Sequence, residues 1–138
     1  MTTPETVTEG AAVRAVRTMY EAFARGDLPA VLALLDPEIT WIEPDGLAVA
    51  GTYTGRDAVV EEVFSYSAQN WDPFRVVPDE FLAVGDDVVV ALGWYDATHR
   101  STGKSFSARF AHVIRLRDGV VTSMEAIADT HPWREAET

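Results

Sequence analysis

Glu43 and His112 are the two residues of this chain whose types could carry out proton-transfer chemistry together. Glu43 precedes Pro44 at the end of one apolar segment, and His112 lies within a later one. A carboxylate at the mouth of an apolar pocket can take a proton from carbon, while an imidazole can hydrogen-bond the oxygen on which negative charge develops. The simpler interpretation is that Glu43 ends a strand in solvent and that His112 is a hydrogen-bonded core residue.

The composition describes one globular domain that needs no disulfide or metal support. The chain has 138 residues, of which 47% are hydrophobic, and it contains no cysteine. Its 22 acidic and 11 basic residues give a net charge of −11, which repels phosphate backbones and anionic lipid surfaces. We therefore predict no nucleic-acid partner and no membrane partner. Residues 1–10 lack the apolar run of a secretion signal, so we predict a cytoplasmic protein.

Three helices are predicted in the first half of the chain. Between residues 11 and 25 apolar residues recur at steps of three and four, which is typical of a helix with one buried stripe. Gly26 ends this helix, and Asp27 caps a second, shorter one. A third helix is predicted from residue 57 to residue 67.

Strands dominate the remainder of the prediction. Ile39, Trp41 and Glu43 alternate and should share one face of a strand. Residues 44–55 contain three glycines and indicate a loop or an irregular hairpin. Four further strands are predicted at residues 74–84, 88–98, 106–117 and 120–127, with a type I′ turn at Asp118-Gly119.

These elements bury their apolar faces when the helices cover one face of a long, curled sheet. The predicted fold class is therefore α+β, a cone of three N-terminal helices on a strongly curved, mainly antiparallel sheet that encloses a pocket. We expect a flexible N-terminus at residues 1–10, one domain at residues 11–130 and a frayed tail at residues 131–138.

Several segments, in this order, resemble the nuclear-transport-factor-2-like superfamily, in particular its branch of ketosteroid isomerases and SnoaL-like polyketide cyclases. They are Gly26-Asp27-Leu28, residues 39–44 (ITWIEP), residues 53–57 (YTGRD) and residues 113–119 (VIRLRDG). The resemblance covers nearly the whole chain and implies the same cone fold. It is less specific for function, because this fold carries many activities.

The resemblance implies roles for Glu43 and His112. Glu43 falls where the isomerases keep an Asp just before a Pro, which implies that it is the general base. His112 falls where they place the acid that donates to the substrate oxyanion. Their tyrosine on the first helix corresponds to Met19, and Tyr20 is one residue later, about 100° further round the helix.

Asp129 is the alternative base. SnoaL-like cyclases are similar to this chain in having an Asp shortly after the last strand, where it acts as acid and base in ring closure. If Met124 lines the pocket together with Ala126 and Ala128, alternation turns Asp129 away unless a bulge re-aims it. Sequence alone leaves the choice between Glu43 and Asp129 open.

The candidate substrate-binding residues are aromatic or long apolar side chains that form either a pocket wall or ordinary core. They are Tyr20, Trp41, Tyr53, Phe64, Trp94, Phe110 and Met124. Glu43, His112 and Asp129 have suitable atoms for a metal site, but the chain has no pair of histidines at ligand spacing. We predict no metal and no cofactor.

Two functions fit these observations. The first is a cofactor-independent acid–base enzyme of isomerase or polyketide-cyclase type that acts on a small hydrophobic carbonyl compound. The alternative is a non-catalytic binding or scaffold module that holds an apolar ligand or a partner in the same cone.

A homodimer is also predicted. Arg109, Arg115 and Arg117 form an outward row that alternates with Ala111 and Val113. This mixture of arginine and apolar residues is typical of interfaces, although it also fits a solvated charged face.

Overall fold

The computed structural model describes residues 9–138, which fold into six strands and six helical segments. The strands are β1 (Leu35–Glu43), β2 (Gly51–Thr54), β3 (Trp71–Val84), β4 (Val88–His99), β5 (Ser105–Arg117) and β6 (Val120–Ala128). The helical segments are α1 (Ala11–Ala24), α2 (Leu28–Ala33), α3 (Arg56–Ala58), the π-helix η1 (Val59–Phe64), α4 (Ser65–Asn70) and α5 (His131–Ala136). None of these helices is long and apolar enough to cross a membrane.

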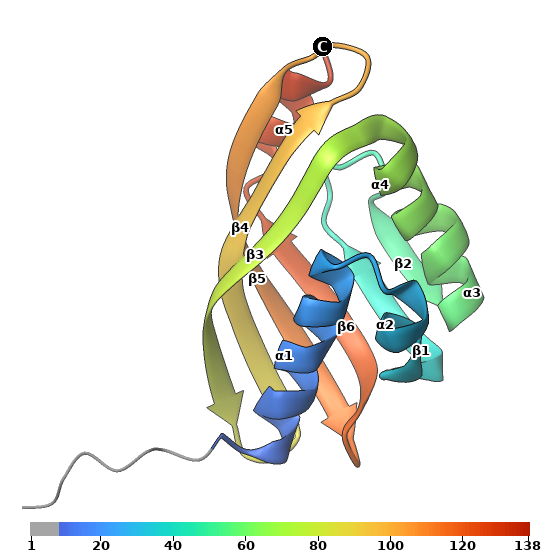
Figure 1. The fold of residues 1–138 in the computed structure, drawn as a ribbon, viewed down its shortest axis with the longest axis vertical. Helices are drawn as coiled ribbons and strands as arrows, with labels where there is room; N and C mark the ends of the chain where they lie inside the picture. The colour runs from blue at the N-terminus through green and yellow to red at the C-terminus, as the bar shows by residue number, and fades with distance from the viewer. Residues whose placement is uncertain (1–8) are drawn as a thin grey trace, which may run out of the picture.

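All six strands belong to one mixed sheet in the order β2-β1-β6-β5-β4-β3. Neighbouring strands are antiparallel except for β1 and β6, which run parallel. Helices α1 and α2 and the continuous run α3-η1-α4 lie on one side of this curved sheet (Figure 1). The α+β cone predicted from the sequence is confirmed.

The helices follow the predicted apolar stripes. In α1 the buried side chains include Val13, Val16 and Met19, at steps of three residues. Asp27 caps α2, because its Oδ1 accepts a hydrogen bond from the Ala30 backbone N–H at 3.2 Å. The predicted third helix is longer than expected, since helical structure continues from residue 56 to residue 70.

Two turns of the sheet can be compared with the prediction. The stretch expected to be a loop or irregular hairpin contains β2, which pairs antiparallel with β1 and places Gly51 opposite Glu43. Asp118 and Gly119 both have positive φ, 52° and 79°. Positive φ at both central residues is the requirement of a type I′ hairpin, so this predicted turn is confirmed.

Gly93 allows strands β3 and β4 and the core to approach closely. A Cβ atom at this position would lie 2.3 Å from the Val77 carbonyl oxygen and 2.6 Å from Cζ of Phe110. The register between β3 and β4 shifts between Pro78 and Glu80, next to this contact. Glycine is therefore required here for close packing rather than for an unusual backbone angle.

Residues 131–136 form a packed helix, so the prediction of a frayed tail is wrong. Helix α5 buries Trp133 and Ala136, and the Trp133 ring lies 4.7 Å from the Phe106 ring and 4.9 Å from the Tyr95 ring, centroid to centroid. Aromatic pairs of this kind stabilise the fold beyond the effect of the area that they bury. This packing keeps the segment helical although the residues that flank Trp133 are polar. This end of the chain closes one end of the cone (Figure 1).

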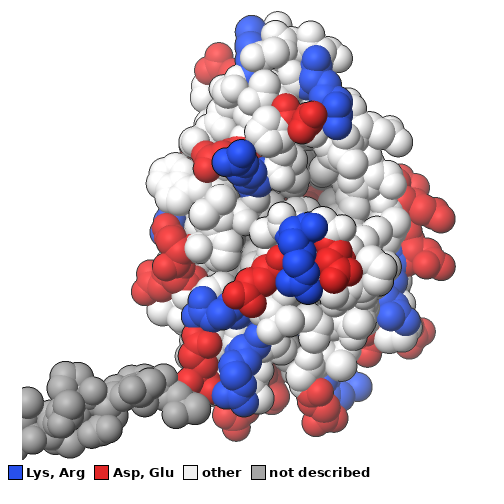
Figure 2. Space-filling model, viewed as in Figure 1, with Lys and Arg blue, Asp and Glu red and all other residues white. Residues whose placement is uncertain are grey.

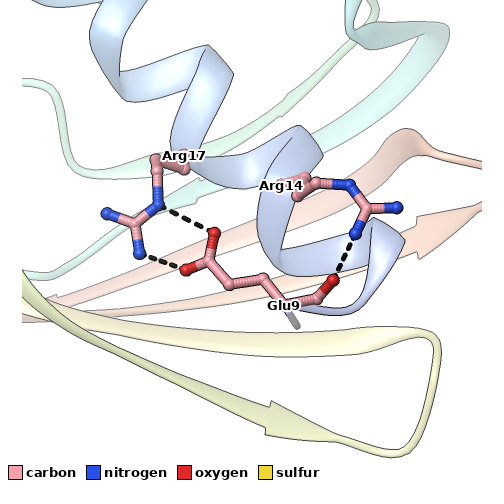
Figure 3. A network of polar contacts seen from close by, with 3 residues as sticks. All are labelled: Glu9, Arg14 and Arg17. Carbon is pink, nitrogen blue, oxygen red and sulfur yellow. Dashed lines mark hydrogen bonds and ion pairs between the residues drawn. The ribbon is translucent and has the colours of Figure 1, made fainter. Parts of the chain in front are cut away.

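At the start of α1 a small polar network joins Glu9 to two arginines (Figure 3). Arg17 Nε donates to Glu9 Oε1 at 3.1 Å, and Arg14 donates to the Glu9 carbonyl oxygen. The Arg17 guanidinium also lies 4.7 Å above the Phe81 ring of β3. These groups are exposed to solvent, so they position the helix while adding little stability. The predicted flexible N-terminus falls mostly on residues 1–8, which lie outside the described residues.

Candidate functional site

The inner side of the cone contains an apolar cavity between the sheet, α1 and the helical run from residue 56. Its volume is about 80 Å³, several times the roughly 10–15 Å³ that one water molecule requires. The cavity lining is mostly aromatic or aliphatic and includes Glu43, Tyr20, Tyr95 and His112. Uncharged residues surround a hollow on one face of the molecule (Figure 2).

Glu43 enters the cavity from the last position of β1. The alternation of the strand turns Ile39, Trp41 and Glu43 to the same side, and all three are buried. Trp41 Nε1 donates a hydrogen bond to Glu43 Oε2 at 2.6 Å. Burial raises the pKa of Glu43 to about 7, although the Trp41 hydrogen bond opposes this change. A carboxyl group with this pKa can exchange protons near neutral pH.

His112 is held between two tyrosine hydroxyls. Its Nδ1 lies 2.5 Å from the Tyr20 hydroxyl oxygen, and its Nε2 lies 2.5 Å from the Tyr95 hydroxyl oxygen. The Phe110 ring stacks on the imidazole with ring centroids 4.0 Å apart. Burial lowers the pKa of His112 to about 3, so the ring is neutral at physiological pH.

A count of hydrogens defines what this triad can donate. Burial raises the pKa of Tyr20 and Tyr95, so both hydroxyls keep their hydrogens at neutral pH. A neutral imidazole carries one N–H and accepts at its other nitrogen. Three hydrogens are therefore present for two links, which leaves one tyrosine O–H free to bond a ligand. His112 has both nitrogens occupied and no hydrogen left for a ligand.

The comparisons with known proteins identify the family of the chain. A SnoaL-like domain matches residues 16–124 of the chain, which include most of the sheet and all of the Tyr20, Glu43, Tyr95 and His112 positions. The chain belongs to the SnoaL-like domain family.

Related proteins extend the match beyond the family segment. An NTF2-like protein from Burkholderia thailandensis is 34% identical, with a TM-score of 0.87 and coverage of 95% of this chain and 99% of that one. TerC, co-crystallized with polyporic acid, is 27% identical, with a TM-score of 0.84 and coverage of 94% and 100%. An uncharacterized protein of Mycobacterium tuberculosis is 28% identical over 118 residues, 86% of this chain and 88% of that protein.

Most of the predicted site residues of this SnoaL-like domain lie together. The cavity lining includes the predicted residues Glu43, His112, Tyr20, Trp41, Phe64 and Met124. Trp41, Glu43 and His112, which strand alternation predicts to face one cavity, all line it. Tyr20 reaches His112 although it is one residue later than the corresponding isomerase position, because both Met19 and Tyr20 line the cavity.

Four predicted residues lie elsewhere. The prediction for Trp94 is wrong: it is 42% exposed on the outer face of the sheet, opposite Arg109. Phe110 is buried behind His112, and Tyr53 is half-buried and donates to the Val49 carbonyl oxygen at 2.7 Å. None of these three residues lines the cavity.

Asp129 also lies outside the cavity and is exposed. Its Oδ1 accepts a hydrogen bond from the His131 backbone N–H at 3.3 Å, and its own N–H donates to the Arg109 carbonyl oxygen. The alternation that turns Asp129 away is therefore retained at the end of β6, and no bulge re-aims the carboxylate into the cavity.

Tyr95 lines the cavity and pairs with His112, although it is not among the predicted site residues. Tyr95 follows Trp94, and only one of two neighbouring strand residues can face the cavity. Asp96 and Thr98 belong to the same alternate set as Trp94, and polar residues in that set indicate its solvent side. Trp133 also lines the cavity and is absent from the predicted site, because the sequence predicts a frayed tail at residues 131–138.

Within residues 9–138 the structure contains no group of three or more histidine or acidic residues arranged to hold a metal ion. The polar side chains that line the cavity are two carboxyl groups, Glu43 and Glu137, the neutral imidazole of His112, and tyrosine and serine hydroxyls.

Proposed function

We propose that this SnoaL-like domain is a cofactor-independent acid–base enzyme, of isomerase or polyketide-cyclase type, acting on a small hydrophobic carbonyl compound. The observation that carries this proposal is a buried carboxyl group, Glu43, with a pKa of about 7, which lies in the same apolar cavity as the triad Tyr20, His112 and Tyr95. Groups that titrate near neutral pH inside a cavity are typical of proton-transfer sites.

In the proposed mechanism Glu43 removes a proton from the carbon next to the substrate carbonyl. Negative charge then develops on the carbonyl oxygen, and the free O–H of Tyr20 or Tyr95 donates to it. His112 acts as a positioning residue, because its N–H polarises the tyrosine that donates. In an isomerisation, protonated Glu43 returns the proton to a different carbon. In a ring closure, the enolate carbon attacks a second carbonyl, whose π electrons move to its oxygen, and protonated Glu43 gives its proton to the resulting alkoxide.

The location of the polar groups favours Glu43 over Asp129 as the base. Glu43 lines the cavity, whereas Asp129 is exposed and accepts a backbone hydrogen bond outside it. The role that the cyclase resemblance implies for Asp129 therefore has no geometric support. Ring closure with Glu43 as the base has both groups that it needs in one cavity, a carboxylate and a tyrosine O–H donor.

Exchange of α-protons tests the proposal. A panel of small hydrophobic ketones in D₂O is followed by NMR with the wild type, Glu43→Gln and Asp129→Asn. Wild-type exchange should exceed that of Glu43→Gln by about 10²–10⁴-fold, the usual contribution of a general base, and Asp129→Asn should match the wild type. Equal exchange by the wild type and Glu43→Gln across the panel would refute the proposal.

The alternative is a non-catalytic binding or scaffold module. One observation favours it: both ring nitrogens of His112 are hydrogen-bonded, to Tyr20 and Tyr95. A buried histidine with a purely structural role would be paired in the same way. The co-crystallization of TerC with polyporic acid supports ligand binding by this fold without identifying a reaction. Saturable binding of the same ketones without any exchange would favour this alternative.

We also propose that the outer face of the sheet joins two copies of the chain. Val77, Trp94 and Ile127 are exposed there, at 44%, 42% and 52%. The Arg109 guanidinium lies 5.3 Å from the Trp94 ring and 2.7 Å from Asp79 Oδ2. Exposed apolar residues with arginine are typical of interface cores, so sedimentation should give a dimer at tens of micromolar. A monomer at that concentration would refute it.

A further inference from the structure

The charges of the cavity have only one sign. Among the described residues that line it, Glu43 and Glu137 are acidic, and no lysine or arginine is present. His112 is neutral because its buried ring has a low pKa. The chain as a whole carries a net charge of −11. A low-dielectric cavity with this lining disfavours an anionic ligand and favours a neutral or positively charged one.

Helix α5 places a carboxylate beside aromatic rings at one end of this cavity. Trp133 and Glu137 are four residues apart, with Glu137 N donating to the Trp133 carbonyl oxygen at 3.2 Å, so their side chains lie on the same face of the helix. Both line the cavity. Burial and then the Glu137 charge raise the pKa of Tyr66, which places Tyr66 near the same carboxylate.

Two further rings complete this end of the cavity. The Trp133 ring centroid lies 5.7 Å from that of Trp71 and 5.8 Å from that of Phe74. Trp71 and Phe74 both line the cavity. Four aromatic side chains and one carboxylate therefore surround the same region.

Aromatic rings beside a carboxylate are suited to an organic ammonium group. The faces of the rings carry negative charge that attracts a cation, and tryptophan gives the strongest attraction. An alkylated ammonium group also buries methyl groups against the rings. A neutral hydrocarbon would gain the apolar contact but would gain nothing from Glu137.

We propose that the α5 end of the cavity, formed by Tyr66, Trp71, Phe74, Trp133 and Glu137, binds an alkylated ammonium group. The substrate class is then a hydrophobic carbonyl compound that also carries a positive charge. This inference rests on the proposed function only in using the same cavity as the ligand site. Trp133 and Glu137 follow residue 124, where the family match ends, whereas Tyr66, Trp71 and Phe74 lie within it.

Three probes with one common ring test the charge preference in the full chain. They are (3-hydroxyphenyl)trimethylammonium, its neutral isostere 3-tert-butylphenol, and the anion 3-hydroxybenzoate. Binding is followed by titration of the tryptophan indole N–H signals in NMR spectra, with the Trp133 signal assigned from Trp133→Phe. The ammonium probe should bind about 2- to 30-fold more tightly than the isostere, and the anion should bind most weakly.

Two matched variants test the position of the charge. Glu137→Gln should reduce the preference for the ammonium probe over 3-tert-butylphenol by about 2- to 5-fold. Glu135→Gln, on the same helix, makes the same change in net charge, but Glu135 is exposed and pairs with His131. Glu135→Gln should leave the ratio of the two affinities unchanged within experimental error.

Three results would overturn this inference. They are equal affinity for the ammonium probe and its isostere, no binding of either at millimolar concentration, and equal effects of Glu137→Gln and Glu135→Gln. Each leaves the α-proton exchange of neutral ketones available as a separate test of the proposed function. Conversely, a lack of exchange would not alter a measured preference for the ammonium probe.

Discussion

The buried carboxyl group of Glu43 should reduce the stability of the folded protein at and above neutral pH. Its pKa rises from an ordinary 4.5 to about 7 on folding, mainly because burial penalises the charged form. The folded state therefore binds this proton more tightly than the unfolded chain. The contribution of the Glu43 proton to the free energy of unfolding is fully present below pH 4.5, decreases as the pH rises toward 7, and is lost above it.

The size of this effect follows from the same two values. One pKa unit corresponds to about 1.4 kcal/mol, so the change from 4.5 to about 7 amounts to about 3 kcal/mol above pH 8. Glu43→Gln keeps the shape and can still accept from Trp41 Nε1, but it has no charge to bury. The variant should be more stable than the wild type by up to about 3 kcal/mol at pH 8 and nearly equal to it at pH 4.5.

Urea denaturation at both pH values measures this difference. The wild-type profile alone would mislead, because His112 has its pKa lowered to about 3 and therefore makes stability rise with pH between about 3 and 6.5. Subtracting the wild-type free energy of unfolding from that of the variant at each pH removes the His112 contribution, which is common to both proteins. Glu125→Gln is the control, since Glu125 is exposed on β6 and should change stability by less than about 0.5 kcal/mol.

A Glu43→Gln variant that is equally stable or less stable than the wild type at pH 8 would refute the reasoning. It would mean that the Glu43 carboxylate is compensated in the folded protein, and its assignment as a base that titrates near neutral pH would lose its basis.

Other predictions test the triad, the sheet and the interface. The exchange of α-protons should rise with pH and level off above about 7 as Glu43 ionises; a rate independent of pH between 5 and 8 would contradict this. His112→Ala should lower exchange by about 10–10³-fold by freeing both tyrosines from their positions, measured with folding checked by circular dichroism. Gly93→Ala should lower the urea midpoint of unfolding, because the new Cβ would lie 2.3 Å from the Val77 carbonyl oxygen. An unchanged midpoint would contradict the requirement for glycine at this position. Trp94→Glu should convert the proposed dimer to a monomer in sedimentation while leaving exchange unchanged.

The sequence predicts most of the fold because the apolar residues of its long elements repeat at regular steps. Alternation in β1 places Trp41 and Glu43 on the inner face, and alternation in β5 does the same for His112. The limits of the prediction lie where local preference and tertiary packing disagree. Residues 131–136 are a short polar segment, and they are held as a helix by tertiary contacts: Trp133 packs on rings from three strands, and the Thr102 hydroxyl donates to the Ala136 carbonyl oxygen.

The candidate site was predicted less completely than the fold. Glu43, His112 and Tyr20 could be selected by residue type and family resemblance. The pairing of His112 with Tyr95 could not, because it depends on which alternate residues of β4 face inward and on the register that places Tyr95 opposite Ala108. Choosing Trp94 as a wall residue followed its size, whereas its neighbours Asp96 and Thr98 mark that side of the strand as the outer one.

The link between Tyr20, His112 and Tyr95 has two equivalent arrangements of its hydrogens. When Tyr20 donates to Nδ1, the ring donates from Nε2 and the spare hydrogen is on Tyr95; reversing both links moves it to Tyr20. The two tyrosine oxygens and the two imidazole nitrogens stay paired in either arrangement, and no heavy atom has to move. The cavity can thus change the position of its donor without rebuilding its walls. A scaffold with this property could accept carbonyl groups at two places, so small changes in its lining could redirect the same chemistry to a different molecule.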